Sequence, residues 1–554
     1  MPFCLGLDFG TESVRAILVD ARSGATMATS VDRYADGVIE HALPGTVVTL
    51  GTDWALQNPA DWLDGLARTV AGVLSASGVD PADVIGLGVD FTSCTVLPTD
   101  ARGRPLCQID GLVNQPHAWP KLWKHHAAQP QADRVTDLAA ERAERWLPRY
   151  GGRISSEWML PKALQVLEEA PEIYRRAAHV LEGGDWIVWQ LTGTLTRNAC
   201  AAGYKGLWHR REGYPSRAYL AALDPRFERF YEEKATGNVS APGSLAGRLS
   251  PAWAARLGLG TDVEVAVPII DAHAAVLGGG VGEAGPLFLI MGTSTCHLLM
   301  ASGESLVPGI AGVVEDGIVP GLHGYEAGQA AVGDILAWYV QHAAPASVHD
   351  EARAAGCSVH DVLSEKAARL APGESGLVAL DWWNGNRCTL MNSELSGVLV
   401  GLTLGTRPEH VYRALIEATA FGTRVIVEAF ESAGLAATRL VAGGGLAANP
   451  LVMQVYSDVC GRDLEVAGSP QASALGAAML GAVAAGPDRG GHASLAEAVA
   501  RMAPPPSRVY RPDAPRRKTY DELYRCYREL YDAFGRTSDA MPRLRELRVK
   551  GVRS

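Results

Sequence analysis

The stretch that decides the fold is residues 3–19, FCLGLDFGTESVRAILV. Its apolar residues 3–7 and 14–19 are typical of two β-strands, and Gly10 in the short segment between them predicts a hairpin turn. A tight glycine turn exposes backbone N–H groups, here beside the Thr11 hydroxyl, and such groups attract anions. Asp8 at the end of the first strand is a candidate Mg²⁺ ligand, directly or through water. Taken alone, however, this pattern more often belongs to an ordinary hairpin.

A second stretch of the same kind lies near the middle of the chain, at residues 287–300, LFLIMGTSTCHLLM. It predicts two strands around a turn at 292–294, so that Gly292-Thr293 matches Gly10-Thr11 of the first hairpin. Two such turns at matching places indicate an internal repeat. Together they are harder to dismiss as ordinary hairpins than either turn alone. We therefore expect two similar halves facing each other across a cleft, with the boundary at the glycine-rich residues 280–286.

The segments after the first hairpin alternate between helix and strand. Asn58-Pro59 predicts a helix start, and an apolar stripe from Trp62 to Leu74 follows at helical spacing. Residues 84–89 then form a continuous apolar run, typical of a buried strand, which ends at Asp90. Strands that alternate with helices predict an α/β fold.

The last third of the chain continues this alternation. Residues 439–466 predict strand, glycine-rich turn, helix and strand. Residues 470–484 predict a helix of small residues, for which Ser469 is the expected N-cap. A late helix carries an apolar stripe from Tyr520 to Phe534, which we expect to pack on the core.

Length, charge and cysteine content bound the class of protein. A chain of 554 residues is too long for one core and predicts two large domains. The formal net charge of -11 repels phosphate backbones and anionic lipid, so we expect neither nucleic acid nor a membrane as partner. Nine scattered cysteines without a C-x-x-C pair favour reduced thiols in the cytoplasm. The sequence shows no signal segment and no apolar run of about 20 residues. Oligomeric state is not determined, and a homodimer is one open alternative.

Residues 443–449, GGGLAAN, form a third candidate site. Glycines after a strand let the backbone approach a flat ligand closely. The segment also fits the G-x-G-x-x-A fingerprint of dinucleotide-binding proteins, and Asp463 and Glu465 follow near the expected spacing of about 20 residues. An NAD-binding protein is therefore a competing interpretation, although it gives the two Gly-Thr hairpins no role.

Three charged residues are candidates for chemistry on a hydroxyl group. Asp271 ends the apolar segment beside the expected boundary, where it could accept a proton from an alcohol during phosphoryl transfer. The alternative, that Asp271 merely caps the next helix, is equally weighted. Glu326 and Lys205 could bind sugar hydroxyls, and their alternative is an exposed surface position.

Taken together, these residues resemble the FGGY carbohydrate kinases, which belong to the actin and hexokinase superfamily. The resemblance covers about residues 3–485, and weaker family marks fall in order between the hairpins: DARGRPL at 100–106, Asp185-Trp186, and Leu191-Thr192-Gly193. It implies two actin-like (ribonuclease H-like) ATPase domains flanking a central cleft. Residues 1–283 would bind the sugar, and residues 284–554 would bind ATP and end in a helical tail.

Within the family, five segments are most similar to the members that phosphorylate L-ribulose, a small-molecule ketopentose. They are GVDFTSCT at 88–95, ISSEW at 154–158, GYKGLW at 203–208, MGTSTC at 291–296 and EAGQ at 326–329. Kinases of D-ribulose or xylulose are the nearest alternative. A non-kinase ATPase or scaffold of the actin superfamily is a remote one. Many relatives carry an acid in a Trp-x-Asp segment where this chain has Trp123-Lys124-His125, so that acidic sugar contact is not expected here.

The resemblance also implies roles for single residues. Asp271 is expected to be the catalytic base, and Asp8 and Asp271 the carboxylates on the Mg²⁺ side. The expected ketopentose contacts are Ser93, Lys205, Asp271 and Glu326. The expected ATP contacts are Gly10, Thr11, Arg15, Gly292, Thr293 and Ser294 at the phosphates, and Gly444, Gly445 and Asn449 at the adenosine.

Overall fold

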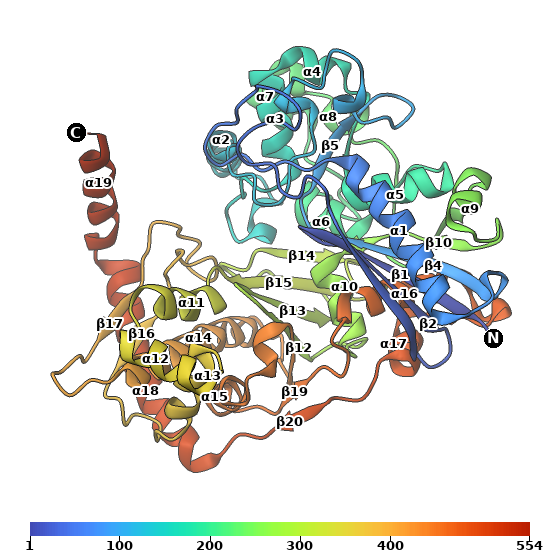
Figure 1. Cartoon of the computed structure of the whole chain (residues 1–554). Coiled ribbons are helices and arrows are strands. Elements are labelled where there is room, and N and C mark those ends of the chain that lie inside the picture. The colour runs from blue at the N-terminus through green and yellow to red at the C-terminus, as the bar shows by residue number, and fades with distance from the viewer. Residues whose placement is uncertain (554) are drawn as a thin grey trace.

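The computed structural model describes residues 1–553, and each half of this chain contains a seven-stranded mixed β-sheet (Figure 1). The first sheet has the order β3-β2-β1-β4-β10-β9, with β11 paired to β4. Its strands are β1 (Phe3–Phe9), β2 (Ser13–Asp20), β3 (Thr26–Arg33), β4 (Val84–Phe91), β9 (Leu245–Arg248), β10 (Glu264–Ala266) and β11 (Ile269–Ile270).

The second sheet repeats this plan in the order β14-β15-β13-β12-β18-β19-β20. Its strands are β12 (Leu287–Met291), β13 (Thr295–Ala301), β14 (Gly312–Glu315), β15 (His323–Gln329), β18 (Leu440–Gly443), β19 (Leu464–Val466) and β20 (Arg508–Tyr510). In each sheet an antiparallel hairpin, β1–β2 or β12–β13, borders a parallel strand, β4 or β18. The expected hairpins, the α/β class and the internal repeat are therefore confirmed.

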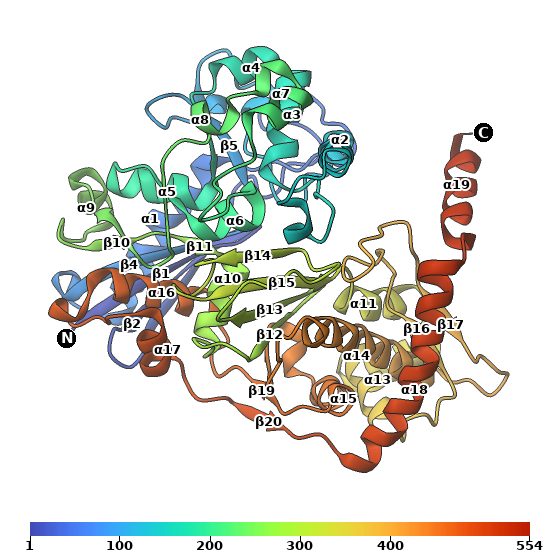
Figure 2. The same cartoon turned by 180° about the vertical axis from the view of Figure 1, so that it is seen from behind.

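Two helices of small residues join the sheets. α16 (Ala472–Ala485) belongs to the second half but lies beside β1 and β4 of the first sheet (Figure 1, Figure 2). A Cβ on Gly6 or Gly88 would come within 1.9 or 1.8 Å of a carbonyl oxygen of α16, so only glycine permits this approach. α10 (Asp271–Gly278) packs on α16 and reaches Phe288 of β12. The two halves therefore share one hydrophobic cluster.

The start of α16 corrects one prediction. The helix begins at Ala472, and its N-cap is Gln471, which makes no side-chain capping bond. Ser469 Oγ instead accepts the N–H of Gln471 at 3.2 Å, so this hydroxyl stabilises the turn before the helix. The predicted cap at Asn58 is confirmed, because its side chain accepts the N–H of Ala60 at the start of α1 (Pro59–Ser77).

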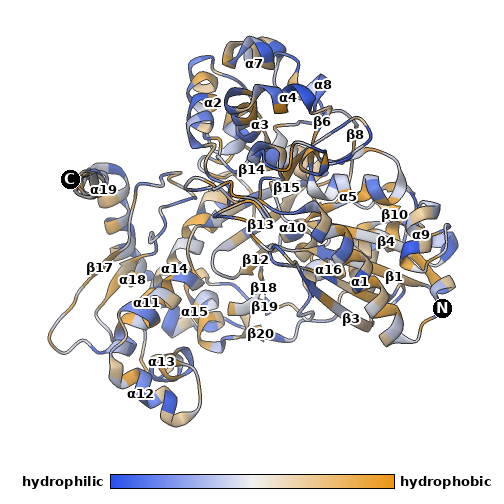
Figure 3. Cartoon of the chain, turned by 45° about the horizontal axis from the view of Figure 1, so that its top comes forward, coloured by the Kyte–Doolittle hydropathy of each residue, from blue (hydrophilic) through white to orange (hydrophobic). Residues whose placement is uncertain are grey.

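Three further hydrophobic clusters complete the molecule. One lies between the first sheet, α1 and α5 (Gly183–Thr192). A second fills an outer lobe that includes α2 (Gln129–Glu141), α3 (Met159–Glu169) and α8 (Phe230–Glu233). The third packs the second sheet against α14 (Pro408–Ser432) and α15 (Pro450–Cys460). In Figure 3, blue marks the hydrophilic stretches on the peripheral helices α2, α8 and α12 (Ala346–Ala355).

The C-terminal segment is helical, as expected. α18 (Ala514–Asp532) buries four tyrosines against the second core, Tyr520, Tyr524, Tyr527 and Tyr531, and α19 (Ala540–Arg553) follows it. No helix in residues 1–553 is both long enough and apolar enough to cross a membrane.

Candidate active site

Polar residues follow three neighbouring strands of the first sheet at the same edge. Phe9 of β1, Phe91 of β4 and Ile270 of β11 lie in register. The first turn, the Thr92-Ser93 segment and Asp271 therefore leave the sheet side by side, and the Thr92 N–H donates to the carbonyl of Phe9 at 3.0 Å. Ligand sites of open α/β sheets lie at such carboxyl ends. The structure thus brings together Asp8, Ser93 and Asp271, which sequence placed far apart.

The first Gly-Thr turn is braced from two sides. The Gly10 N–H donates to the carbonyl of Ser13 at 2.9 Å, and Arg15 Nη1 donates to Asp8 Oδ2 at 2.9 Å. Trp123 Nε1 donates to Thr11 Oγ1 at 3.0 Å. Arg15, an expected ATP contact, therefore already pairs with Asp8. Trp123 enters the site from a segment for which sequence analysis predicted only the absence of an acid.

The second Gly-Thr turn lies beside the glycine-rich segment. Gly443 of β18 is in register with Ile290 of β12, and a Cβ on Gly444 would lie 2.5 Å from the carbonyl oxygen of Met291. Gly292, Thr293, Gly444 and Gly445 are all exposed. The Gly292 N–H donates to the carbonyl of Ser294, and the carbonyls of Gly292 and Thr293 accept N–H groups of residues 332–334, so the second turn is braced like the first.

The Asn449 side chain makes three hydrogen bonds in this region. Its Oδ1 accepts the N–H groups of Leu451 and Val452 at the start of α15, and its Nδ2 donates to Ser364 Oγ at 2.9 Å. The Asn449 side chain therefore fixes the end of the glycine-rich segment. Glu465, the acid that an NAD site would require, instead pairs with Arg439 at 3.2 Å.

Asp271 is the first residue of α10. The N-cap is Ile270, and Asp271 Oδ1 accepts the N–H of Ala272 at 2.6 Å, so Asp271 is not the helix cap that was the alternative. Burial and then the charge of Asp8 raise the pKa of Asp271 to about 7. The charge of Glu326 from the second half adds to this rise, so Asp271 lies within electrostatic reach of both halves. A carboxylate with a pKa near neutrality suits a general base.

Lys205 and Glu326 form an ion pair between the halves. Lys205, on α6 (Ala199–Gly206), approaches the two oxygens of Glu326 on β15 at 2.7 and 2.8 Å. Burial alone would neutralise both groups, but their attraction outweighs it, so the pKa of Lys205 is raised and that of Glu326 is lowered. Both side chains are therefore charged and mostly buried, and the surface alternative for them is wrong.

Ser93 lies partly exposed in the turn after β4. Its hydroxyl contacts Cys94 Sγ at 3.2 Å, and Cys94 has a φ of 58°. The Ser93 side chain keeps access to solvent at the edge where Asp271 lies.

Sequence analysis missed two charged residues that face each other across the halves. Arg387 Nη2 lies 3.6 Å from Glu157 Oε1. Glu157 stands within the quoted segment at 154–158, but nothing local marked it as a partner for a residue 230 positions away. Only the folded chain brings these two side chains together.

Three carboxyl groups gather at the edge of the first sheet. Asp90 is in register with Asp8 and fully buried; burial, Asp8 and Asp271 raise its pKa well above the ordinary value. Such crowding favours a bound cation. Among residues 1–553, however, no cluster of three or more His, Cys, Asp or Glu side chains could hold a metal ion. An ion here would need further ligands in addition to one or two carboxylates, which suits Mg²⁺ bound largely by water and phosphate.

Comparisons with known proteins identify the same family that the sequence motifs resemble. Models of the N-terminal and C-terminal domains of the FGGY family of carbohydrate kinases match residues 3–278 and 287–485. A ribulokinase of Halalkalibacterium halodurans is 50% identical over 548 residues, covering 99% of this chain and 97% of the relative. A ribulokinase of Mycolicibacterium smegmatis is 49% identical over 553 residues, covering 100% and 97%.

Solved structures share the fold at lower identity. A xylulose kinase from Rhodospirillum rubrum has a TM-score of 0.77 at 24% identity, covering 96% of this chain and 98% of the other. A Plasmodium falciparum glycerol kinase with ADP has a TM-score of 0.73 at 16% identity, with the same coverage.

Proposed function

Since the chain belongs to the FGGY family of carbohydrate kinases, we propose that it transfers the γ-phosphoryl group of ATP to L-ribulose, giving ADP and L-ribulose 5-phosphate. Relatives named ribulokinase, about half identical over nearly the whole chain, support this substrate. The observation that carries the proposal is Asp271, whose carboxylate is influenced by Asp8 of the first hairpin and Glu326 of the second half.

The sugar would lie against the edge of the first sheet. Ser93 and Asp271 leave neighbouring strands there, and the Lys205–Glu326 pair offers both a donor and an acceptor for hydroxyl groups. A site that pairs each hydroxyl rejects an epimer that leaves a buried group unpaired. We infer that these four side chains set the preference for a 2-ketopentose.

Asp271 would accept the proton of the attacking 5-hydroxyl. Phosphoryl transfer proceeds mainly through positioning and charge stabilisation, and the base acts late. The N–H of Ala272 holds one oxygen of Asp271, so the other is free to face the hydroxyl. The position of Asp271 at the start of α10, between the two halves, keeps this oxygen where both substrates would meet.

ATP would lie mostly against the second half. We infer that Gly292, Thr293 and Ser294, with Gly10, Thr11 and Arg15 opposite, face the phosphates. Gly444, Gly445 and Asn449 would adjoin the adenosine. The crowded carboxyl groups of Asp8 and Asp271 fit Mg²⁺, which would supply neutralising charge at the phosphates.

The domain division and location complete the proposal. We infer a sugar-binding domain over residues 1–283 and an ATP-binding domain over 284–554, because the first sheet ends at Ile270 and the second begins at Leu287. A cytoplasmic location is supported by nine cysteines that form no disulfide, six of them buried and two, Cys357 and Cys526, exposed, because a cytosol keeps such thiols reduced.

The direct test is coupled ADP release with each of the four 2-ketopentoses. We expect the highest kcat/KM with L-ribulose. A preference for D-ribulose or xylulose would replace the substrate but keep the reaction class. Stabilisation by NAD but not by Mg-ATP in a thermal shift, with no ADP release, would overturn the proposal.

A further inference from the structure

Lys162 is a buried lysine outside the residues assigned above. Its side chain is 1% exposed. Its Nζ donates to the carbonyl oxygens of Cys94 at 2.6 Å and Leu122 at 2.7 Å, with a longer bond to Lys121 at 3.4 Å. An ammonium group has three donors, and here all three meet main-chain carbonyls. These bonds offset the cost of burying the charge.

Helix formation does not explain this lysine. α3 begins at Met159, so Lys162 stands in its first turn, where the helix dipole disfavours a cation. Burial lowers the pKa of Lys162 to about 8, and the amine stays largely charged at neutral pH. Burying a cation at this place is therefore costly, and the three hydrogen bonds to main-chain carbonyls offset that cost.

The acceptors belong to two segments that enter the candidate active site. Cys94 directly follows Ser93, and Leu122 directly precedes Trp123, whose indole contacts Thr11. Cys94 holds a φ of 58°, a left-handed conformation that is strained for a residue other than glycine. The bond from Lys162 to the Cys94 carbonyl holds the turn in that conformation and ties it to the Trp123 segment.

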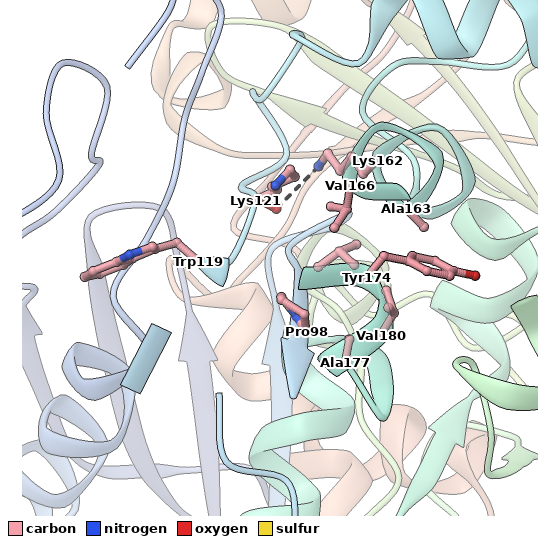
Figure 4. A pocket seen from close by; sticks show the side chains of 10 residues that line it. Pro98, Trp119, Lys121, Lys162, Ala163, Val166, Tyr174, Ala177 and Val180 are labelled. Carbon is pink, nitrogen blue, oxygen red and sulfur yellow. Dashed lines mark hydrogen bonds between the residues drawn. The ribbon is translucent and has the colours of Figure 1, made fainter. Parts of the chain in front are cut away.

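Lys162 also lines a gap in the packing next to the two segments. A small cavity of about 20 Å³ lies beside them, lined by Val96, Pro98, Trp119, Lys121, Lys162 and Tyr174 among others. Figure 4 shows Lys162 and Lys121 together at this cavity, joined by the dashed hydrogen bond. The cavity is about the size of one water molecule, so the Lys162 bonds act together with close packing to hold the two segments.

We propose that Lys162 is a positioning residue for the sugar, holding Ser93 and Trp123 in one fixed relation through the Cys94 and Leu122 carbonyls. This inference rests on the proposed function, because it presumes that Ser93 contacts the ketopentose. Lys162 itself does not reach the site. Its effect is on substrate affinity and selectivity.

The test compares Lys162→Met with Lys234→Met. Lys234 also donates to a main-chain carbonyl, that of Ala177 at 2.6 Å, which belongs to neither the Ser93 nor the Trp123 segment. We expect Lys162→Met to raise the KM for ketopentose about tenfold or more, equivalent to about 1.4 kcal/mol. The KM for ketopentose should rise more than the KM for ATP. Lys234→Met should leave all these values at the wild-type level.

Two further variants separate positioning from stability. Lys162→Arg keeps the charge and donors, and should give a ketopentose KM between wild type and Lys162→Met, which also keeps the test open if the methionine variant does not fold. In a Ser93→Ala background, Lys162→Met should add little to KM, since both act through one contact.

Three results would overturn the positioning role. They are a wild-type KM in Lys162→Met, an arginine variant no better than methionine, and fully additive effects with Ser93→Ala. Absence of ketopentose turnover in the wild type would instead refute the proposed function, so the two failures are distinguishable.

Discussion

At the scale of single residues, the reactivity of Asp271 follows from its neighbours. Burial and the charge of Asp8 raise its pKa to about 7, so half of the carboxyl groups would carry a proton at that pH. A protonated carboxyl cannot accept the proton of a sugar hydroxyl. Activity must therefore fall as the pH drops through this pKa.

The pH profile tests this directly. We predict that kcat/KM falls about tenfold per pH unit on the acid side of about pH 7 and is level on the alkaline side. Residual turnover of Asp271→Asn should lose this acid limb, since asparagine does not titrate. An identical acid limb in that variant would assign the titration to another group.

Lys121 allows a stability prediction at the same scale. Its side chain is 3% exposed, its Nζ has no hydrogen-bond partner in the described residues, and burial followed by the charge of Lys162 lowers its pKa to about 7. Lys121→Met should raise the free energy of unfolding by about 1–3 kcal/mol at pH 7 or below.

The pH dependence of that gain supplies its control. Between about pH 7 and 10.5 the unfolded lysine keeps its proton while the folded one loses it, so the wild type gains stability as pH rises. The advantage of Lys121→Met should therefore shrink across this range in urea denaturation. A gain that is constant with pH would show that Lys121 is not a buried charge.

At the scale of elements, the approach of α16 to the first sheet depends on glycine. A Cβ on Gly86 would lie 2.2 Å from the carbonyl oxygen of Gly481, which is main chain and cannot rotate away. Gly86→Ala should therefore destabilise the protein by about 3 kcal/mol. Gly303→Ala, where nothing lies within 4 Å, is the matched control and should be nearly neutral in the same denaturation experiment. Equal effects of the two changes would refute the tight contact.

Elements were more predictable than their packing. The hairpins at 3–19 and 287–300 and the cap at Asn58 depend on neighbouring residues, so local patterns identified them. The small residues of 470–484 predicted a helix, but not that it would lie on the sheet of the other half. That choice depends on Gly6 and Gly88, which lie hundreds of residues earlier. Trp123 and Arg387 were not identified as site residues from the sequence for the same reason, since their partners are distant in the chain.

At the scale of the whole molecule, the Lys205–Glu326 ion pair joins one candidate sugar-binding residue of the first half to one of the second. Lys205→Met would leave Glu326 buried without its main partner, at a cost of about 3 kcal/mol. The double variant Lys205→Met with Glu326→Leu should recover most of that stability in denaturation experiments. Its ketopentose KM should nevertheless stay raised at least about tenfold. A double variant with wild-type KM would mean that the pair serves only to join the halves.

The central claim is that the two halves form one site in which Asp271 activates a sugar hydroxyl. It is tested most directly by measuring ADP release with and without L-ribulose, in the wild type and in Asp271→Asn. The account predicts that the sugar raises the wild-type rate many-fold, while Asp271→Asn folds, binds the sugar and turns over roughly 10²- to 10⁴-fold more slowly. A sugar-independent wild-type rate, or near-normal turnover in Asp271→Asn, would contradict it.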